Sequence, residues 1–176
     1  PKKKLGQHFL IAEPTAKKIV NALHIKSDDT ILEIGPGMAV LTPFIASAAN
    51  QVVAVDTDAK LLALSKTRLA ECANITWRHA DILETTPAGL LPDSRRPIRV
   101  IGNLPYNISS PIIFWLIDHR ADLSDALIML QKEVATRLCA APGGKAYGVL
   151  SIMVQRHACC TRLFDVAANN FYPPPK

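Results

Sequence analysis

The segment Thr30–Ile34 and the glycines that follow it predict a strand that turns directly into a helix. The segment is mostly apolar, as in a buried strand, and Gly35-Pro36-Gly37 ends it. Apolar residues then resume at helical spacing between positions 40 and 45. Glycine suits such a turn because a ligand can approach the backbone there, and the following helix begins with unpaired N–H groups. The unit is therefore a candidate ligand-binding turn.

Further apolar segments alternate with helical patterns along the chain. The predicted strands are 51–55, 75–78, 98–101, 125–130 and 149–154. The predicted helices lie within 14–23, 40–45, 59–72, 111–117 and 132–138, and segment 85–97 is predicted to be a loop too polar for the core. This alternation predicts an α/β fold with a mostly parallel sheet and helices on both faces.

Asn103-Leu104-Pro105-Tyr106 comes directly after one of these apolar segments. Because Pro105 has no N–H to donate to a sheet, the Asn103 side-chain carbonyl and a main-chain carbonyl can both face one external donor. The ring of Tyr106 adds a stacking surface, worth roughly 1–3 kcal/mol when the partner is a nucleobase. Two acceptors beside a ring fit an adenine amine. The alternative is a strand-end turn in which proline fixes φ and tyrosine fills the core.

Two acidic residues follow the next predicted strands. Asp56 lies 21 positions after Gly35 (56 − 35), close to the spacing of about 20 for the carboxylate that holds a ribose in nucleotide-binding α/β units. The dinucleotide fingerprint G-x-G-x-x-G would need glycine at Val40, so a dehydrogenase is disfavoured. The ordered set fits S-adenosylmethionine, with Asp56 at the ribose, Asp81 at the adenine amine and Ile82 on the adenine ring. Each aspartate alone also suits a surface turn or helix cap.

Composition sets further bounds. At 176 residues, with 49% hydrophobic and 20% charged residues, the chain is expected to form one soluble domain. A net charge of +5 favours an anionic partner without naming it. The cysteines show no metal-binding or disulfide spacing, which favours a reduced, cytoplasmic protein without a metal. No apolar run reaches the roughly 18 residues of a membrane span. The chain begins without Met and stops after three prolines, so a fragment is expected.

Several blocks together closely resemble the ribosomal RNA adenine dimethylases, in particular the bacterial small-subunit members. The blocks are residues 5–10, 33–37, 103–109, 129–134, 145–148 and 171–176. Macrolide-resistance methylases of large-subunit RNA share N-x-P-Y but resemble blocks 131–134 and 145–148 less well. The resemblance implies a Rossmann-like class I methyltransferase with a mostly parallel, seven-stranded sheet. It also implies that residues 1–176 form the catalytic domain, with an N-terminal arm at 1–13 and without the family's C-terminal helical domain.

The resemblance also implies a set of site residues. The implied catalytic residues are Asn103, Leu104, Pro105 and Tyr106. The implied contacts of S-adenosylmethionine, and of its product S-adenosylhomocysteine, are Gln7, His8, Leu10, Glu33, Gly35, Gly37, Asp56, Asp81, Ile82 and Asn103. Three positions depart from the family pattern. His8 stands where many relatives have Asn, Ala39 replaces a frequent third glycine, and Asp56 is shorter than the common Glu.

The implied reaction is dimethylation of the N6 amines of two adjacent adenosines in small-subunit ribosomal RNA, within a 30S-type subunit precursor and as part of ribosome biogenesis. A monomer without membrane contact is expected. Candidate phosphate contacts, which are equally well surface charges, are Lys2, Lys3, Lys4, Arg95, Arg96 and Arg99. One alternative is a ribosome-assembly or RNA-binding factor in which catalysis is secondary. Another is a methyltransferase of a different planar amide or amine, which usually carries N-P-P-Y; Leu104 speaks against it.

Overall fold

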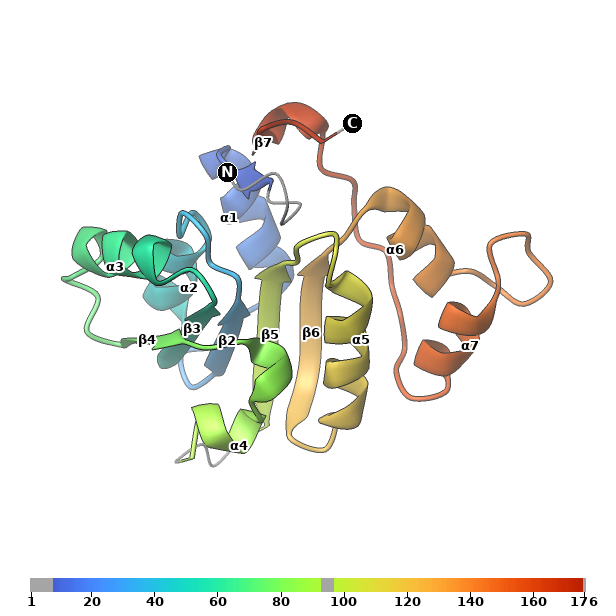
Figure 1. The fold of residues 1–176 in the computed structure, drawn as a ribbon, viewed down its shortest axis with the longest axis horizontal. Helices are drawn as coiled ribbons and strands as arrows, with labels where there is room; N and C mark the ends of the chain where they lie inside the picture. The colour runs from blue at the N-terminus through green and yellow to red at the C-terminus, as the bar shows by residue number, and fades with distance from the viewer. Residues whose placement is uncertain (1–7, 93–96, 176) are drawn as a thin grey trace.

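A parallel sheet forms the centre of the molecule. The computed structural model describes residues 8–92 and 97–175. The central strands are β2 (Thr30–Ile34), β3 (Gln51–Asp56), β4 (Ile75–His79), β5 (Ile98–Asn103) and β6 (Leu123–Met129). They form a five-stranded sheet in the order β4-β3-β2-β5-β6, with every neighbouring pair parallel (Figure 1). The predicted α/β class and parallel sheet are confirmed.

The sheet is wound in two directions from β2. The chain moves from β2 to β3 and β4, then returns to β5 on the other side of β2 before reaching β6. Ligands of open parallel sheets bind beyond the carboxyl ends of the strands at such a switch point. Gly102 lets β5 run close to β2, because an added Cβ would lie 2.7 Å from the Ile34 carbonyl oxygen. Every residue of β2 is buried, as its mostly apolar sequence predicts.

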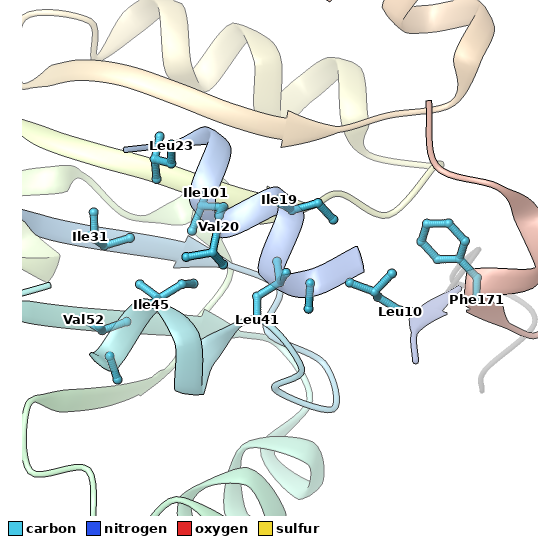
Figure 2. Close-up of a cluster of buried hydrophobic side chains, with 12 residues drawn as sticks. Leu10, Ile19, Val20, Leu23, Ile31, Leu41, Ile45, Val52, Ile101 and Phe171 are labelled. Atoms are coloured by element: carbon cyan, nitrogen blue, oxygen red, sulfur yellow. The ribbon is translucent and has the colours of Figure 1, made fainter. Parts of the chain in front are cut away.

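Helices connect the strands and cover both faces of the sheet (Figure 1). They are α1 (Glu13–Ala22), α2 (Thr42–Ala48), α3 (Ala59–Arg68), α4 (Pro87–Leu90), α5 (Ser109–Asp118), α6 (Lys132–Leu138) and α7 (Val149–Gln155), with the 3-10 helices η2 (Ile82–Glu84) and η3 (Ala168–Asn170). On one face, Val20 of α1 and Ile45 of α2 meet Ile31 and Ile101 of the sheet in one buried cluster (Figure 2). The apolar residues of α1, which recur at helical spacing (Ala16, Ile19 and Val20), therefore form the surface that packs on the sheet.

The opposite face packs against α5, and here one prediction was wrong. Leu90 and Leu91 lie in segment 85–97, which was predicted to be too polar for the core, yet they are only 5% and 4% exposed. They join Trp115 of α5 in the second buried cluster. The Trp115 indole N–H also donates to the Thr85 carbonyl at 2.8 Å. The segment therefore contributes its two leucines to the core, while Thr86, Ala88 and Gly89 remain exposed.

A second wrong prediction concerns segment 149–154, which forms α7 and not a strand. Short apolar runs do not distinguish a buried strand from a helix by periodicity alone. The Gly148 N–H donates to the Ser151 hydroxyl at 3.1 Å at the start of the helix. Val154 then packs against Leu138 of α6 and Ile113 of α5. This third cluster extends the molecule beyond the edge strand β6.

The two remaining strands form a separate ribbon. β1 (Phe9–Leu10) pairs with β7 (Phe171–Tyr172) in antiparallel fashion, apart from the central sheet. The expected seven-stranded sheet is thus, within the described residues, a five-stranded sheet and a two-stranded ribbon. Among those residues, no helix is long and apolar enough to cross a membrane.

Candidate active site

One cleft lies beyond the carboxyl ends of β4, β3, β2 and β5. Its lining includes the following predicted site residues: His8, Leu10, Glu33, Gly35, Gly37, Asp56, Asp81, Ile82, Asn103, Leu104, Pro105 and Tyr106. Gln7, which was also predicted to bind the cofactor, lies outside the described residues. The structure therefore gathers the described members of the predicted set at the switch point of the sheet.

The glycine turn after β2 uses the left-handed backbone region. The angle φ is +67° at Gly35 and +55° at Gly37, where other residues are strained by about 1–2 kcal/mol. A Cβ at Gly37 would lie 3.0 Å from the Phe9 ring, so the arm covers this turn closely. Ala39 also has a positive φ, 53°, and is fully buried. Arg68 of α3, not predicted as a site residue, braces the turn by donating to the Ala39 carbonyl at 2.7 Å.

Asp56 ends β3 and holds the glycine turn. Its Oδ2 accepts from the Gly37 N–H at 3.3 Å, and its Oδ1 accepts from the Asp58 N–H at 2.9 Å. Burial raises the pKa of this carboxyl, while the backbone hydrogen bonds oppose the rise. The carboxylate is therefore fixed in place at the edge of the cleft despite being shorter than glutamate.

Asp81 follows β4 and caps a helix, which is the alternative that the sequence offered to a contact with the adenine amine. Its Oδ1 accepts from the Leu83 N–H at 2.9 Å at the start of η2. Capping and cleft lining are compatible, because the same residue also borders the cleft. Ile82 beside it is 4% exposed and contributes an apolar wall.

Glu33 is a buried carboxyl in the middle of the sheet. It is 1% exposed, and burial raises its pKa to about 7, with a smaller contribution from the charge of Asp56. The neighbouring Thr42 hydroxyl opposes the rise. This contact falls short of a full hydrogen bond, since neither Glu33 Oε2 nor Thr42 Oγ1 has a hydrogen-bonding partner among the described residues. Glu33 is thus a buried acceptor with unused capacity that borders the cleft.

Asn103 is the last residue of β5, and one hydrogen bond fixes its side-chain amide. Its Nδ2 donates to the His8 carbonyl at 2.9 Å, so Oδ1 remains the acceptor. Leu104 buries its side chain in the core at 1% exposure, and its predicted role therefore rests on its main-chain carbonyl. Tyr106 is half-buried, and burial raises the pKa of its hydroxyl. The motif supplies an oriented amide oxygen beside an aromatic ring.

The basic residues proposed to contact phosphate are only partly described. Lys2, Lys3, Lys4, Arg95 and Arg96 lie outside the described residues. The Arg99 side chain is 16% exposed and forms ion pairs of 2.7 Å with Asp29 and Asp125. Those ion pairs raise the pKa of the Arg99 guanidinium and tie it into the protein, which favours a structural role. Within ranges 8–92 and 97–175, no group of three or more His, Cys, Asp or Glu is arranged to hold a metal.

Comparisons with known proteins identify the family. The model of the family described as ribosomal RNA adenine dimethylase matches residues 1–176. A ribosomal RNA small subunit methyltransferase A from Syntrophus aciditrophicus (strain SB) is 46% identical, over 100% of this chain and 63% of the relative. The protein of the same name from Francisella tularensis subsp. novicida (strain U112) is 41% identical, over 99% of this chain and 67% of the relative.

Two solved structures also match this chain over most of its length. A dimethyladenosine transferase from Plasmodium falciparum has a TM-score of 0.85 and 34% identity, over 96% of this chain and 60% of that one. The 23S rRNA methyltransferase ErmE has a TM-score of 0.79 and 27% identity, over 96% and 65%. The chain thus spans between 60% and 67% of the length of these four relatives.

The central sheet with its covering helices is the Rossmann-like fold of methyltransferases. Within that class, this chain belongs to the ribosomal RNA adenine dimethylase family.

Proposed function

We propose that this chain uses S-adenosylmethionine to dimethylate the N6 amines of two adjacent adenosines in small-subunit ribosomal RNA. The observation that carries the proposal is the meeting of two half-sites in one cleft. The glycine turn with Asp56 and Asp81 forms one half, and the motif from Asn103 to Tyr106 forms the other. The names of the curated relatives favour small-subunit RNA, and ErmE, named for 23S rRNA, is less similar.

The residues of the first half-site fit a positively charged nucleoside cofactor. The backbone at Gly35 leaves room for a ligand, because the nearest atom to an added Cβ would be the Asn103 carbonyl oxygen at 3.8 Å. Glu33 borders the same cleft, and a cation bound nearby would favour the charged form of its buried carboxyl. Asp56 and Asp81 both border the cleft, which supports assigning the ribose of the cofactor to Asp56 and its adenine amine to Asp81. When bound, S-adenosylmethionine supplies a methyl group from its sulfonium centre, and the implied product is S-adenosylhomocysteine.

The second half-site orients the amine that receives the methyl group. An adenine amine is a weak nucleophile, because its lone pair is delocalised into the ring. Acceptors at Asn103 Oδ1 and the Leu104 carbonyl favour the pyramidal nitrogen of the transition state. Pro105 has no N–H to donate, so the hydrogen-bond ladder of the strand cannot continue through it. Tyr106 holds the adenine outside its base stack, as base-modifying enzymes require.

The main alternative is an assembly or RNA-binding factor in which catalysis is secondary. The fixed side-chain amide of Asn103 argues against it, because an amide held at the same cleft as the glycine turn has no evident use in RNA binding alone. Methylation of another planar amide or amine is less well supported, because the family match is to RNA adenine dimethylases. The monomeric state, the cytoplasmic location, the 30S-type precursor as partner and the limits of the catalytic domain stay predictions.

The decisive experiment measures transfer of labelled methyl groups to unmethylated small subunits and to naked large-subunit RNA. We expect N6,N6-dimethyladenosine in two adjacent positions of the small-subunit RNA, with little label in the other substrate. The matched control is Asn103→Ala, which removes the oriented acceptor but leaves the glycine turn. Preferential labelling of large-subunit RNA would refute the substrate assignment. Tight binding of small subunits without any transfer would favour the assembly factor.

A further inference from the structure

A segment from the far end of the chain holds the N-terminal arm over the cleft. β1 and β7 pair with Phe9 opposite Tyr172, and both strands lie side by side in Figure 1. The Ile11 N–H donates to the Asn170 carbonyl at 2.8 Å. The Thr15 hydroxyl donates to the Asn170 side-chain oxygen at 2.7 Å. We refer to residues 8–11 and 170–173 as the β1–β7 ribbon.

His8 contacts both Asn103 and Tyr106, and a third contact ties its ring to Pro173 within the ribbon. Its ring Nδ1 lies 2.7 Å from the Pro173 carbonyl oxygen. Its ring centroid lies 4.9 Å from that of Tyr106, with an angle of 31° between the planes. Its own carbonyl accepts from Asn103 Nδ2 at 2.9 Å. One residue thus touches both the amide and the aromatic ring of the proposed amine site.

The Pro173 contact also fixes where the imidazole carries its hydrogen. A carbonyl oxygen only accepts, so His8 Nδ1 must be the donor. Nδ1 carries a hydrogen in this neutral tautomer and in the protonated imidazole alike. The bond to Pro173 therefore persists whether or not the ring is charged, which suits a fixed structural connection.

We propose that His8 is a positioning residue for methyl transfer, anchored by Pro173 so that it orients the Asn103 amide and the Tyr106 ring. This inference rests on the proposed function. It makes the β1–β7 ribbon part of the active site, because the hydrogen bond from Asn103 Nδ2 ends on the backbone of the ribbon. If the ribbon moves, Nδ2 loses its acceptor, and the amide is then free to turn Oδ1 away from the substrate amine.

Two substitutions separate the two side-chain contacts of His8. His8→Asn keeps an N–H donor on the γ-carbon, the same number of bonds from the backbone, but loses the ring. His8→Phe keeps a ring against Tyr106 but loses the donor to Pro173. We expect His8→Phe to speed hydrogen exchange in peptides covering 168–173 and in the Asn103 side-chain amide. His8→Asn should leave both near the parental rates.

Methyl transfer is then measured in single turnovers at saturating cofactor, so that any change in cofactor affinity does not enter. We expect His8→Phe to lower the rate by roughly 10- to 100-fold, since a misplacement of about 1 Å can lower a rate about 10²-fold. His8→Asn should lose less of the rate than His8→Phe, because it keeps the donor to Pro173, and should raise KM for RNA through the altered support of Tyr106. The ratio of the parental rate to the His8→Asn rate should stay constant between about pH 6 and 8, because Nδ1 donates to Pro173 in the neutral and the protonated ring alike.

The control variant is Thr15→Val, which loosens the ribbon at a bond that does not touch the amine site. An equal loss of rate in Thr15→Val and His8→Phe would overturn the proposal, because general loosening would then explain both. Parental exchange and parental rate in His8→Phe would also overturn it, as would a pH-dependent ratio for His8→Asn, which indicates proton transfer. If the parental chain methylates no RNA, the proposed function fails separately, and the exchange measurements still decide whether His8 orients Asn103.

Discussion

Replacing Glu33 by glutamine should remove a dependence of stability on pH that originates inside the sheet. The carboxyl is 1% exposed and has a pKa of about 7, against 4.5 for an ordinary glutamate. Because the folded pKa is the higher one, the folded state holds an extra proton between these two values. Stability from this group is therefore full below about pH 4.5 and is lost as pH rises toward 7.

The size of the effect follows from the shift. One pKa unit corresponds to about 1.36 kcal/mol, so a rise of about 2.5 units (7 − 4.5) gives roughly 3 kcal/mol in the free energy of unfolding. Glutamine has nearly the same shape and does not titrate. Its amide adds N–H donors beside Thr42, and a buried donor without a partner there lowers stability by about 1–3 kcal/mol at every pH. The informative quantity is therefore the difference in the free energy of unfolding between the parent and the variant, followed as a function of pH.

The assay is urea denaturation of the parent and of Glu33→Gln at a series of pH values between 4 and 8.5. Taking the difference between the two proteins cancels the titration of the other carboxyls. We expect the stability of the variant relative to the parent to increase by roughly 3 kcal/mol between pH 4.5 and 7.5, with equal m-values. A difference that stays level across this range would show that Glu33 is ionised normally and that burial does not control it.

Three further outcomes are expected. Asn103→Ala should lower turnover on the order of 10²-fold with little change in cofactor affinity. Tyr106→Ala should also weaken RNA binding, by roughly 1–3 kcal/mol. Single-turnover rates and cofactor titrations of each variant separate the effect on the chemical step from the effect on binding. Gly37→Ala should destabilise by about 1–2 kcal/mol and weaken cofactor binding, because φ is +55° and Phe9 lies 3.0 Å from the new Cβ. Gly143→Ala is its control, since φ is also positive but no atom lies within 4 Å, and unchanged cofactor affinity in both variants would contradict the model of the turn. S-adenosylmethionine at 100 times its dissociation constant should stabilise the fold by about 2.7 kcal/mol in thermal denaturation, and stabilisation by a nicotinamide dinucleotide alone would contradict the cofactor assignment.

The sequence predicted the parts of the site that follow from local order along parallel strands. Gly35, Asp56, Asp81 and Asn103 each stand at or just after the end of a predicted strand. Because parallel strands end at one edge of the sheet, that placement was enough to bring them to one cleft. Their chemical roles were inferred from the same placement and remain predictions for the experiments above.

The parts that escaped prediction depend on contacts between distant segments or on ambiguous short runs. β1 and β7 are two residues each, too short for any periodic pattern, so the ribbon and the Pro173 contact of His8 were not foreseen. Segment 149–154 has apolar residues at nearly every position, which fits a strand and a buried helix equally. Arg99 resembled a surface cation until the structure placed Asp29 and Asp125 beside it.

The pairing of β1 with β7 has a consequence for the order in which the molecule is assembled. Phe9 and Tyr172 are 163 positions apart (172 − 9), so this pairing closes one of the longest loops in the chain. At a synthesis rate of about 5–20 residues per second, the arm leaves the ribosome on the order of 10 s before its partner strand exists. Closing such a loop early gains a two-residue pairing for a large loss of chain entropy, so the sheet forms first. Newly made molecules therefore pass through a stage with a formed sheet and an uncovered cleft, and the Asn103 amide acquires its orientation only after residues 170–173 have been added.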